Sequence, residues 1–119
     1  MAEYDPDVLF VRRVGEAKVV GFAHSYLQSE DVAAKVAAEL NKLIEGKEGV
    51  KLVLTFQGVR FASSSMLAQL IKLHKAVTKA KGHMRLCCLD PSIRDVLHAS
   101  QLDRMLEVYP DEAAALAKL

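Results

Sequence analysis

The sequence predicts one α/β domain over residues 1–119, with a mixed, mainly parallel central sheet of about five strands and helices packed against it. Two observations predict this fold class. Short runs of apolar and β-branched residues alternate along the chain with longer stretches in which apolar residues recur every three or four positions. The chain is also long enough to bury a core without disulfides, and its 51% hydrophobic residues are ordinary for a globular domain.

The first two predicted strands lie at residues 8–14 and 18–22. Gly15 and Glu16 separate them, and glycine in so short a connection is typical of a hairpin. The two strands are therefore expected to pair antiparallel at one edge of the sheet.

The first helix is predicted to begin after Ser29, and residues 24–29 before it show no regular pattern. Ser29 is a candidate N-cap, and the two acidic residues that follow suit the positive end of a helix dipole. Gly46 and Gly49 end this helix. Its apolar residues recur at helical spacing and are Val32, Val36, Leu40, Leu43 and Ile44.

The central strand is predicted at residues 51–56, where Leu52, Val53 and Leu54 form a run with the composition of a buried strand. Val59 and Phe61 add two alternating apolar positions, and Ser63, Ser64 and Ser65 follow. A second helical pattern begins directly after the serines and ends near Lys81 and Gly82, which suit a helix C-terminus; its apolar residues are Met66, Leu67, Leu70, Ile71, Leu73 and Val77. The lysines at positions 72, 75, 79 and 81 are interpreted as a solvated face.

Three more elements complete the pattern. A near-continuous apolar run predicts a strand at 83–89, and Asp90 followed by Pro91 predicts the start of the next helix. A last strand is expected at 106–109, and a terminal helix from 110–112 through Leu119. Strands that alternate with helices favour parallel pairing with right-handed crossovers.

Composition excludes several function classes. Sixteen basic and fifteen acidic residues leave a formal charge of +1, which provides no electrostatic footprint for nucleic acid or a membrane surface. No apolar stretch approaches the roughly 18 residues that span a bilayer. The acidic N-terminus, residues 1–6, lacks the pattern of a signal peptide, so a cytoplasmic protein is expected.

Cys87 and Cys88 are the only cysteines. They are interpreted mainly as small buried or half-buried strand residues, with a redox role as the alternative. Neighbouring cysteines provide no disulfide framework of the kind that secreted proteins use.

The serine triplet is the candidate functional site. A hydroxyl at a helix start can accept a phosphoryl group, because backbone N–H groups and the helix dipole tolerate the new charge. The same charge would oppose a partner that packs on this surface. Simple N-capping by a serine is the structural alternative, and the pattern alone leaves both open.

Other chemistry is poorly supported. A nucleophilic serine needs a base and usually a Gly-x-Ser-x-Gly turn, and the triplet has no glycine beside it. The four histidines show no metal-ligand spacing with one another or with the cysteines, and no glycine motif for nucleotide phosphates is present. No enzymatic activity, metal or cofactor is therefore expected.

The order and spacing of the motifs resemble the STAS domain, the fold of bacterial anti-sigma factor antagonists. The resemblance covers nearly the whole chain and is weakest over residues 1–30. It is carried by the strand at 51–56, the segment 59–67, Gly82 before a strand, and the segments 90–97, 102–104 and 111–116.

The resemblance implies a protein-binding regulator that is not an enzyme. In these antagonists a serine at the start of the helix after the third strand is phosphorylated by a serine-kinase anti-sigma factor, and the unphosphorylated form binds that kinase. The family pattern is an acidic residue, then Ser-Ser-Gly-Leu. Matched to it, Ser63 replaces the acid, Ser64 is the phosphoacceptor, Ser65 is the next serine and its capping neighbour, and Met66 replaces the glycine.

The predicted function is thus a phosphorylation-switched anti-sigma factor antagonist, with Ser63, Ser65 and Met66 near the partner contact. The expected partner is an anti-sigma factor or a serine-kinase-type regulator, and the expected state is a monomer or weak homodimer. The alternative is a STAS scaffold that is never phosphorylated, or a ligand-sensing subunit of another signalling complex.

Overall fold

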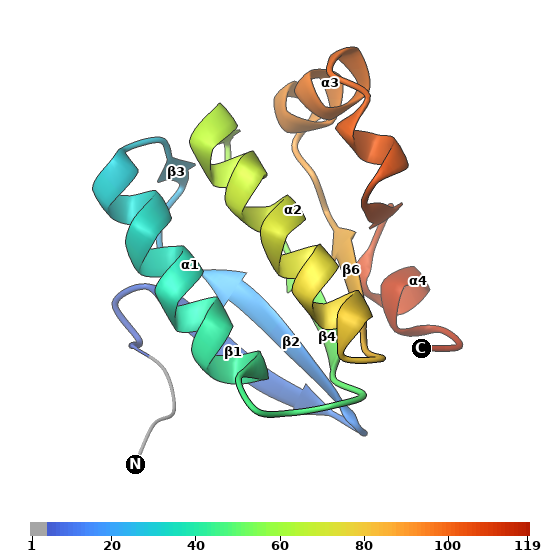
Figure 1. Ribbon diagram of the computed structural model, residues 1–119. Coiled ribbons are helices and arrows are strands. Elements are labelled where there is room, and N and C mark those ends of the chain that lie inside the picture. Colours follow the sequence, from blue (N-terminus) through green and yellow to red (C-terminus); the bar gives the residue numbers. More distant parts are fainter. Residues whose placement is uncertain (1–4) are drawn as a thin grey trace.

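Five strands form one sheet in the computed structural model, which describes residues 5–119, and their spatial order is β1-β2-β4-β6-β7. Only β1 and β2 pair antiparallel; the other neighbours are parallel, as predicted (Figure 1). The strands are β1 (Leu9–Val14), β2 (Ala17–Phe22), β4 (Lys51–Thr55), β6 (His83–Cys87) and β7 (Glu107–Tyr109).

Strand β4 is the middle strand of this sheet. Leu54 is the register partner of Val20 on one side and of Leu86 on the other. Leu52, Val53 and Leu54 are all fully buried, because helices cover both faces of the sheet at this strand. This double burial explains the continuous apolar run in the sequence.

Two very short strands form a second, separate sheet. Strand β3 (Tyr26–Leu27) pairs in parallel with β5 (Phe61–Ala62). The expectation that residues 24–29 are irregular is wrong at these two positions. A strand of two residues is too short to show an alternating pattern, and its pairing partner is distant in sequence.

Two long helices lie side by side on one face of the large sheet, and α4 lies against the other face (Figure 1). Ser29 caps α1 through Val32 N–H, and Asp90 caps α3 through Ser92 N–H, both as predicted. The helices are α1 (Glu30–Ile44), α2 (Ser64–Lys79), α3 (Pro91–Ala99) and α4 (Glu112–Leu116), with a 3-10 turn η1 at Leu102–Arg104.

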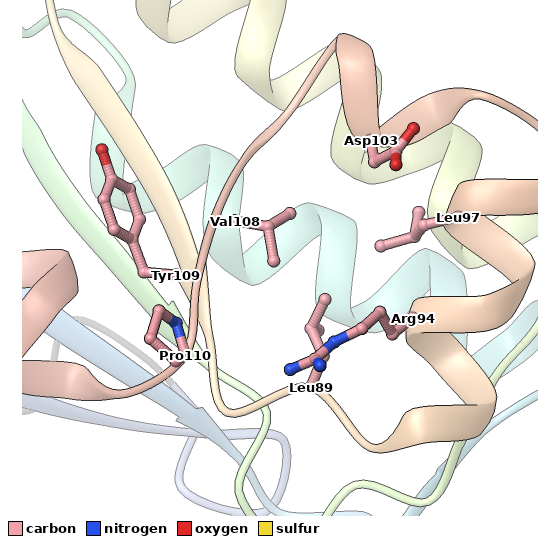
Figure 2. A pocket seen from close by; sticks show the side chains of 7 residues that line it. All are labelled: Leu89, Arg94, Leu97, Asp103, Val108, Tyr109 and Pro110. Atoms are coloured by element: carbon pink, nitrogen blue, oxygen red, sulfur yellow. The ribbon is translucent and has the colours of Figure 1, made fainter.

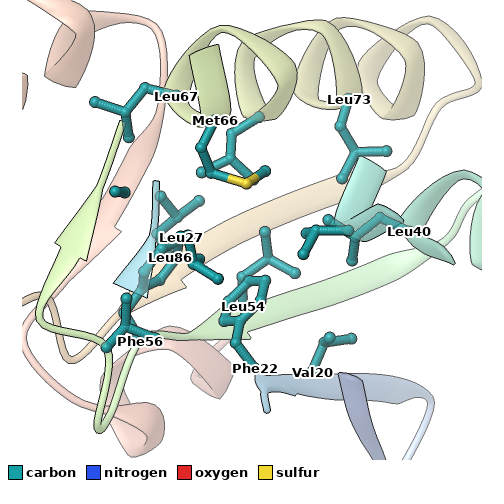
Figure 3. Packing of buried hydrophobic residues seen from close by; sticks show 14 of the residues in the cluster. Val20, Phe22, Leu27, Leu40, Leu54, Phe56, Met66, Leu67, Leu73 and Leu86 are labelled. Carbon is teal, nitrogen blue, oxygen red and sulfur yellow. The ribbon is translucent and has the colours of Figure 1, made fainter. Parts of the chain in front are cut away.

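Most of the core lies between the large sheet and α1, α2 and α3. Leu40 from α1, Met66 and Leu73 from α2, and Leu54 and Leu86 from the sheet meet there (Figure 3). A smaller cluster on the opposite face joins Val19, Val53, Cys87 and Ala115 beneath α4. The helical layer on the first face therefore holds the start of α2 firmly against the sheet.

The terminal helix is shorter than predicted. It ends at Leu116 instead of Leu119, because Ala117 is extended and Lys118 has a φ of 56°. This turn brings Leu119 back against the smaller apolar cluster. Partial burial of Leu119 therefore replaces one more helical turn.

The two cysteines differ in structure, and both are free thiols. Cys87 is the buried last residue of β6, as predicted for a strand cysteine, and burial raises the pKa of its thiol to about 11. Cys88 lies outside the strand with a φ of 60°, so the predicted strand at 83–89 is too long. The chain leaves the sheet here to begin α3.

No helix among residues 5–119 has both the length and the apolar character needed to cross a bilayer. The predicted absence of a signal peptide concerns residues 1–6, of which the first four lie outside the described part of the chain.

Candidate functional site

The serine triplet lies where β5 passes into α2, and the small sheet fixes this junction. Ser63 N–H donates to the carbonyl oxygen of Leu27 at 2.9 Å, which extends the β3–β5 pairing by one bond. Ser63 is extended, with φ −70° and ψ 163°, and Ser64 is the first residue of α2. The junction is therefore set by backbone pairing with a segment more than thirty residues earlier.

Ser63 is the N-cap of α2. Its Oγ accepts a hydrogen bond of 3.1 Å from Met66 N–H, which would otherwise lack a partner in the first turn. The prediction of Ser65 as the capping serine is wrong. An N-cap needs an extended backbone, and Ser64 and Ser65 already belong to the helix.

Ser64 and Ser65 are both exposed. Within residues 5–119, no hydrogen bond engages the Ser64 hydroxyl, so neither capping nor packing accounts for it. The cap is therefore Ser63, and Ser64, the predicted phosphoacceptor, has no capping role. Ser64 is accessible at the start of a helix of 16 residues.

The Met66 side chain points into the core and is fully buried (Figure 3). It lies among the side chains between α2 and the sheet, so it contributes nothing to the surface beside Ser64. Because none of the residue is exposed and its N–H already donates to Ser63 Oγ, Met66 offers a partner no direct contact.

The first turn of α2 contains no acidic residue. The positive end of the helix dipole is therefore not neutralised by a side chain of its own first turn. The exposed Arg60 precedes the triplet by three residues and adds a cation to this end of the domain. The dipole of α2 therefore favours an anion here, whereas the charge of Arg60 also interacts with the Asp90 carboxylate.

Helix α3 borders the same region. The Ser92 hydroxyl lies 2.9 Å from the carbonyl oxygen of Arg60 and 2.7 Å from Asp90 Oδ2, and it can donate to one of them at a time. Hydrogen bonds from the Ser92 hydroxyl and backbone amide lower the pKa of Asp90, and Arg60 adds to this effect. The N-terminus of α3 is thus tied to Arg60, the residue just before β5.

Two exposed aromatic residues stand beside the triplet. Tyr26 and Phe61 are register partners in the β3–β5 pair, and 55% and 42% of their surfaces are exposed. Leu27 and Ala62, the next residue in each strand, are buried. Sequence reasoning did not identify this pair, because an alternating pattern does not tell whether an aromatic residue faces the core or solvent.

A base beside the serines or a metal site would indicate other chemistry in the described residues. His98 hydrogen-bonds Asp103, and no histidine there hydrogen-bonds a serine of the triplet. Among residues 5–119, no three His, Cys, Asp or Glu side chains are grouped to hold a metal ion. The four lysines interpreted as a solvated face are all exposed.

Comparison with known proteins identifies one family. The STAS domain family matches residues 30–115 of the chain. A relative called anti-sigma F factor antagonist, from Paenibacillus polymyxa, is 24% identical over 117 residues, which cover 98% of this chain and 91% of that protein.

Solved structures share the fold. An anti-sigma-factor antagonist (STAS) domain protein from Planctomyces limnophilus superposes with a TM-score of 0.82 at 23% identity, over 92% of this chain and 96% of the other. The Bacillus cell fate determinant SpoIIAA, solved in the phosphorylated form, has a TM-score of 0.66 at 17% identity, over 90% of this chain and 96% of its own.

Proposed function

This chain belongs to the STAS domain family, and on that premise we propose that it is an anti-sigma factor antagonist switched by phosphorylation of Ser64. The observation that carries the proposal is the exposed Ser64 hydroxyl at the first position of α2, next to a serine that already supplies the cap. A relative named as an antagonist and a structural neighbour solved in its phosphorylated form support it.

A phosphoryl group on Ser64 is compatible with the fold. Its dianion would lie at the positive end of α2, where the dipole favours negative charge by about 0.3–1 kcal/mol at an exposed site. No acidic side chain of the first turn opposes it. Phosphorylation is therefore expected to leave the domain folded.

The same group is hostile to a docked partner. Tyr26 and Phe61 offer an exposed apolar surface beside Ser64, and a partner that covers them would also exclude water from the serine. Burial of an unpaired charge in such a contact is strongly unfavourable. The unphosphorylated form is thus the binding form in this proposal.

The partner proposed is an anti-sigma factor or a related serine-kinase-type regulator, and the domain itself has no enzymatic activity. A net charge of +1 provides no reason to propose direct contact with nucleic acid or membrane. The free protein is proposed to be a monomer or a weak homodimer, which sedimentation over a range of concentrations tests.

Intact-mass analysis tests the phosphoacceptor. The protein is incubated with ATP and each serine-kinase anti-sigma factor of its own organism. The wild type should gain one phosphoryl group, Ser64→Ala should gain none, and the matched control Ser65→Ala should gain one. Unchanged labelling of Ser64→Ala moves the acceptor to a neighbouring serine.

Calorimetric titration tests the switch. Ser64→Asp should bind the partner at least about tenfold more weakly than Ser64→Ala, a difference of about 1.4 kcal/mol. Equal affinities favour the second candidate, a STAS scaffold or ligand-sensing subunit that is never phosphorylated. The replacement of the family's acid by Ser63 is the observation that favours this candidate.

A further inference from the structure

A pocket of about 330 Å³ lies between α3 and the edge strand β7, and no serine of the triplet lines it (Figure 2). Leu89 and Leu97 are buried and Val108 is half-buried, and these three side chains give the pocket an apolar lining. Its position at the carboxyl ends of β6 and β7 is one where α/β folds often bind ligands.

Two charged side chains line the pocket on either side of Leu97 (Figure 2). Asp103 already has a hydrogen-bond partner, because its Oδ2 lies 3.2 Å from His98 Nδ1. Arg94 differs: within residues 5–119 no hydrogen bond or ion pair holds its guanidinium, which points across the pocket toward Leu89 and Pro110. Five N–H donors are thus available beside an apolar surface.

We propose that this pocket binds a small amphipathic carboxylate, with the carboxylate on Arg94 and an aliphatic body against Leu89, Leu97 and Val108. The planar guanidinium fits a carboxylate by two parallel hydrogen bonds. The Asp103 carboxylate repels a second anionic group at the far end of the pocket. The ligand therefore carries one charged end only.

The size of the pocket limits the ligand. Its volume is at the lower end of the range for small-molecule sites. If each non-hydrogen atom occupies about 30 Å³, as a water molecule does, the pocket holds roughly ten such atoms. An acid with six to eight carbons, in round numbers, matches this space. Because the pocket is open and the ligand small, a Kd on the order of 1–10 mM is expected.

Amide chemical shifts in ¹⁵N-labelled protein test the proposal with hexanoate as the probe. Hexanoate should produce saturable shifts at Leu89, Leu97 and Val108. Acetate lacks the aliphatic body and 1-hexanol lacks the charge, so each should bind at least about tenfold more weakly, which is the range of one charge-assisted hydrogen bond or two buried methylenes.

Variants at exposed positions complete the test without risk to the fold. Arg94→Gln should weaken hexanoate binding at least about tenfold, and Arg94→Lys should retain part of the affinity because it retains the charge. Arg104→Gln is the matched control, since Arg104 is exposed nearby and does not line the pocket.

Three results would overturn the proposal. If hexanoate changes amide chemical shifts over the whole surface and without saturation, the pocket is not a binding site. If wild type and Arg94→Gln bind hexanoate equally, Arg94 does not recognise the carboxylate. The same conclusion follows if hexanoate and 1-hexanol bind equally.

Discussion

Stability measurements test whether Ser63, and not Ser64, caps α2. Ser63→Ala removes one hydrogen bond, the 3.1 Å contact between Ser63 Oγ and Met66 N–H, and leaves the backbone bond from Ser63 N–H to Leu27 in place. No acidic side chain in the first turn can replace the cap. Loss of a serine cap costs about 1 kcal/mol, within a range of about 0.5–2 kcal/mol.

For a domain of this size, that change lowers the melting temperature by about 3–5 °C. Urea unfolding followed by circular dichroism measures the free energy of unfolding directly, and the slope with denaturant should not change. Ser63→Asn should restore most of the lost stability, because asparagine is an equally good N-cap.

Ser64→Ala is the matched control for this experiment. Ser64 is exposed and its hydroxyl makes no bond within residues 5–119, so its removal should change stability by less than about 0.5 kcal/mol. If Ser64→Ala destabilises the domain as much as Ser63→Ala, the assignment of the cap to Ser63 alone is refuted.

Two further predictions concern the cysteines and Asp90. At pH 8 iodoacetamide should modify Cys88 before Cys87, as peptide mass mapping reports, because a pKa of about 11 leaves only about 0.1% of Cys87 as thiolate. The folded state prefers the neutral Cys87 thiol, so its stabilising contribution is complete below its ordinary pKa of 9.0 and is lost as pH rises through about 11. Ser92→Ala should raise the pKa of Asp90 part of the way toward its ordinary 3.8, measured by NMR titration, because it removes the hydroxyl bond that lowers this pKa most and keeps the bond from the Ser92 backbone amide. The stabilising contribution of Asp90 is present above 3.8 and disappears as pH falls through the lowered pKa; an unchanged pKa in the variant would contradict this account.

The parts of the fold that the sequence predicts correctly are those with strong local signals. The run from Leu52 to Leu54 is apolar because both faces of β4 are covered, and Gly15 allows the tight turn of the hairpin with a φ of 61°. The caps Ser29 and Asp90 are recognisable because a short polar side chain precedes a helical pattern in each case.

The parts that could not be predicted depend on contacts between distant segments. Strand β3 exists because Tyr26 and Leu27 meet Phe61 and Ala62, and nothing local in either dipeptide signals that pairing. The same pairing places the bond between Ser63 and Leu27, and so decides which of three identical residues becomes the cap. Three serines in a row carry no sequence signal that separates them.

The two departures from the family pattern have different structural consequences. Met66 occupies the place of a glycine, but its side chain is buried. It therefore adds no bulk to the surface beside Ser64 that would obstruct a partner. Ser63 keeps the capping function of an aspartate and lacks its charge. Of the two departures, only the absence of a carboxylate at position 63 changes the surface that a kinase or partner would contact.

Ser63→Asp tests whether that carboxylate matters. Aspartate caps as well as serine and adds a favourable interaction with the helix dipole, so stability should stay equal or rise by up to about 1 kcal/mol. If a serine-kinase anti-sigma factor reads the acid, this variant should be phosphorylated on Ser64 faster than the wild type. Ser65→Asp adds the same charge two residues later and should not accelerate labelling. Equal rates for Ser63→Asp and wild type would mean that the kinase recognises other features of this surface, with Tyr26 and Phe61 as the next residues to substitute.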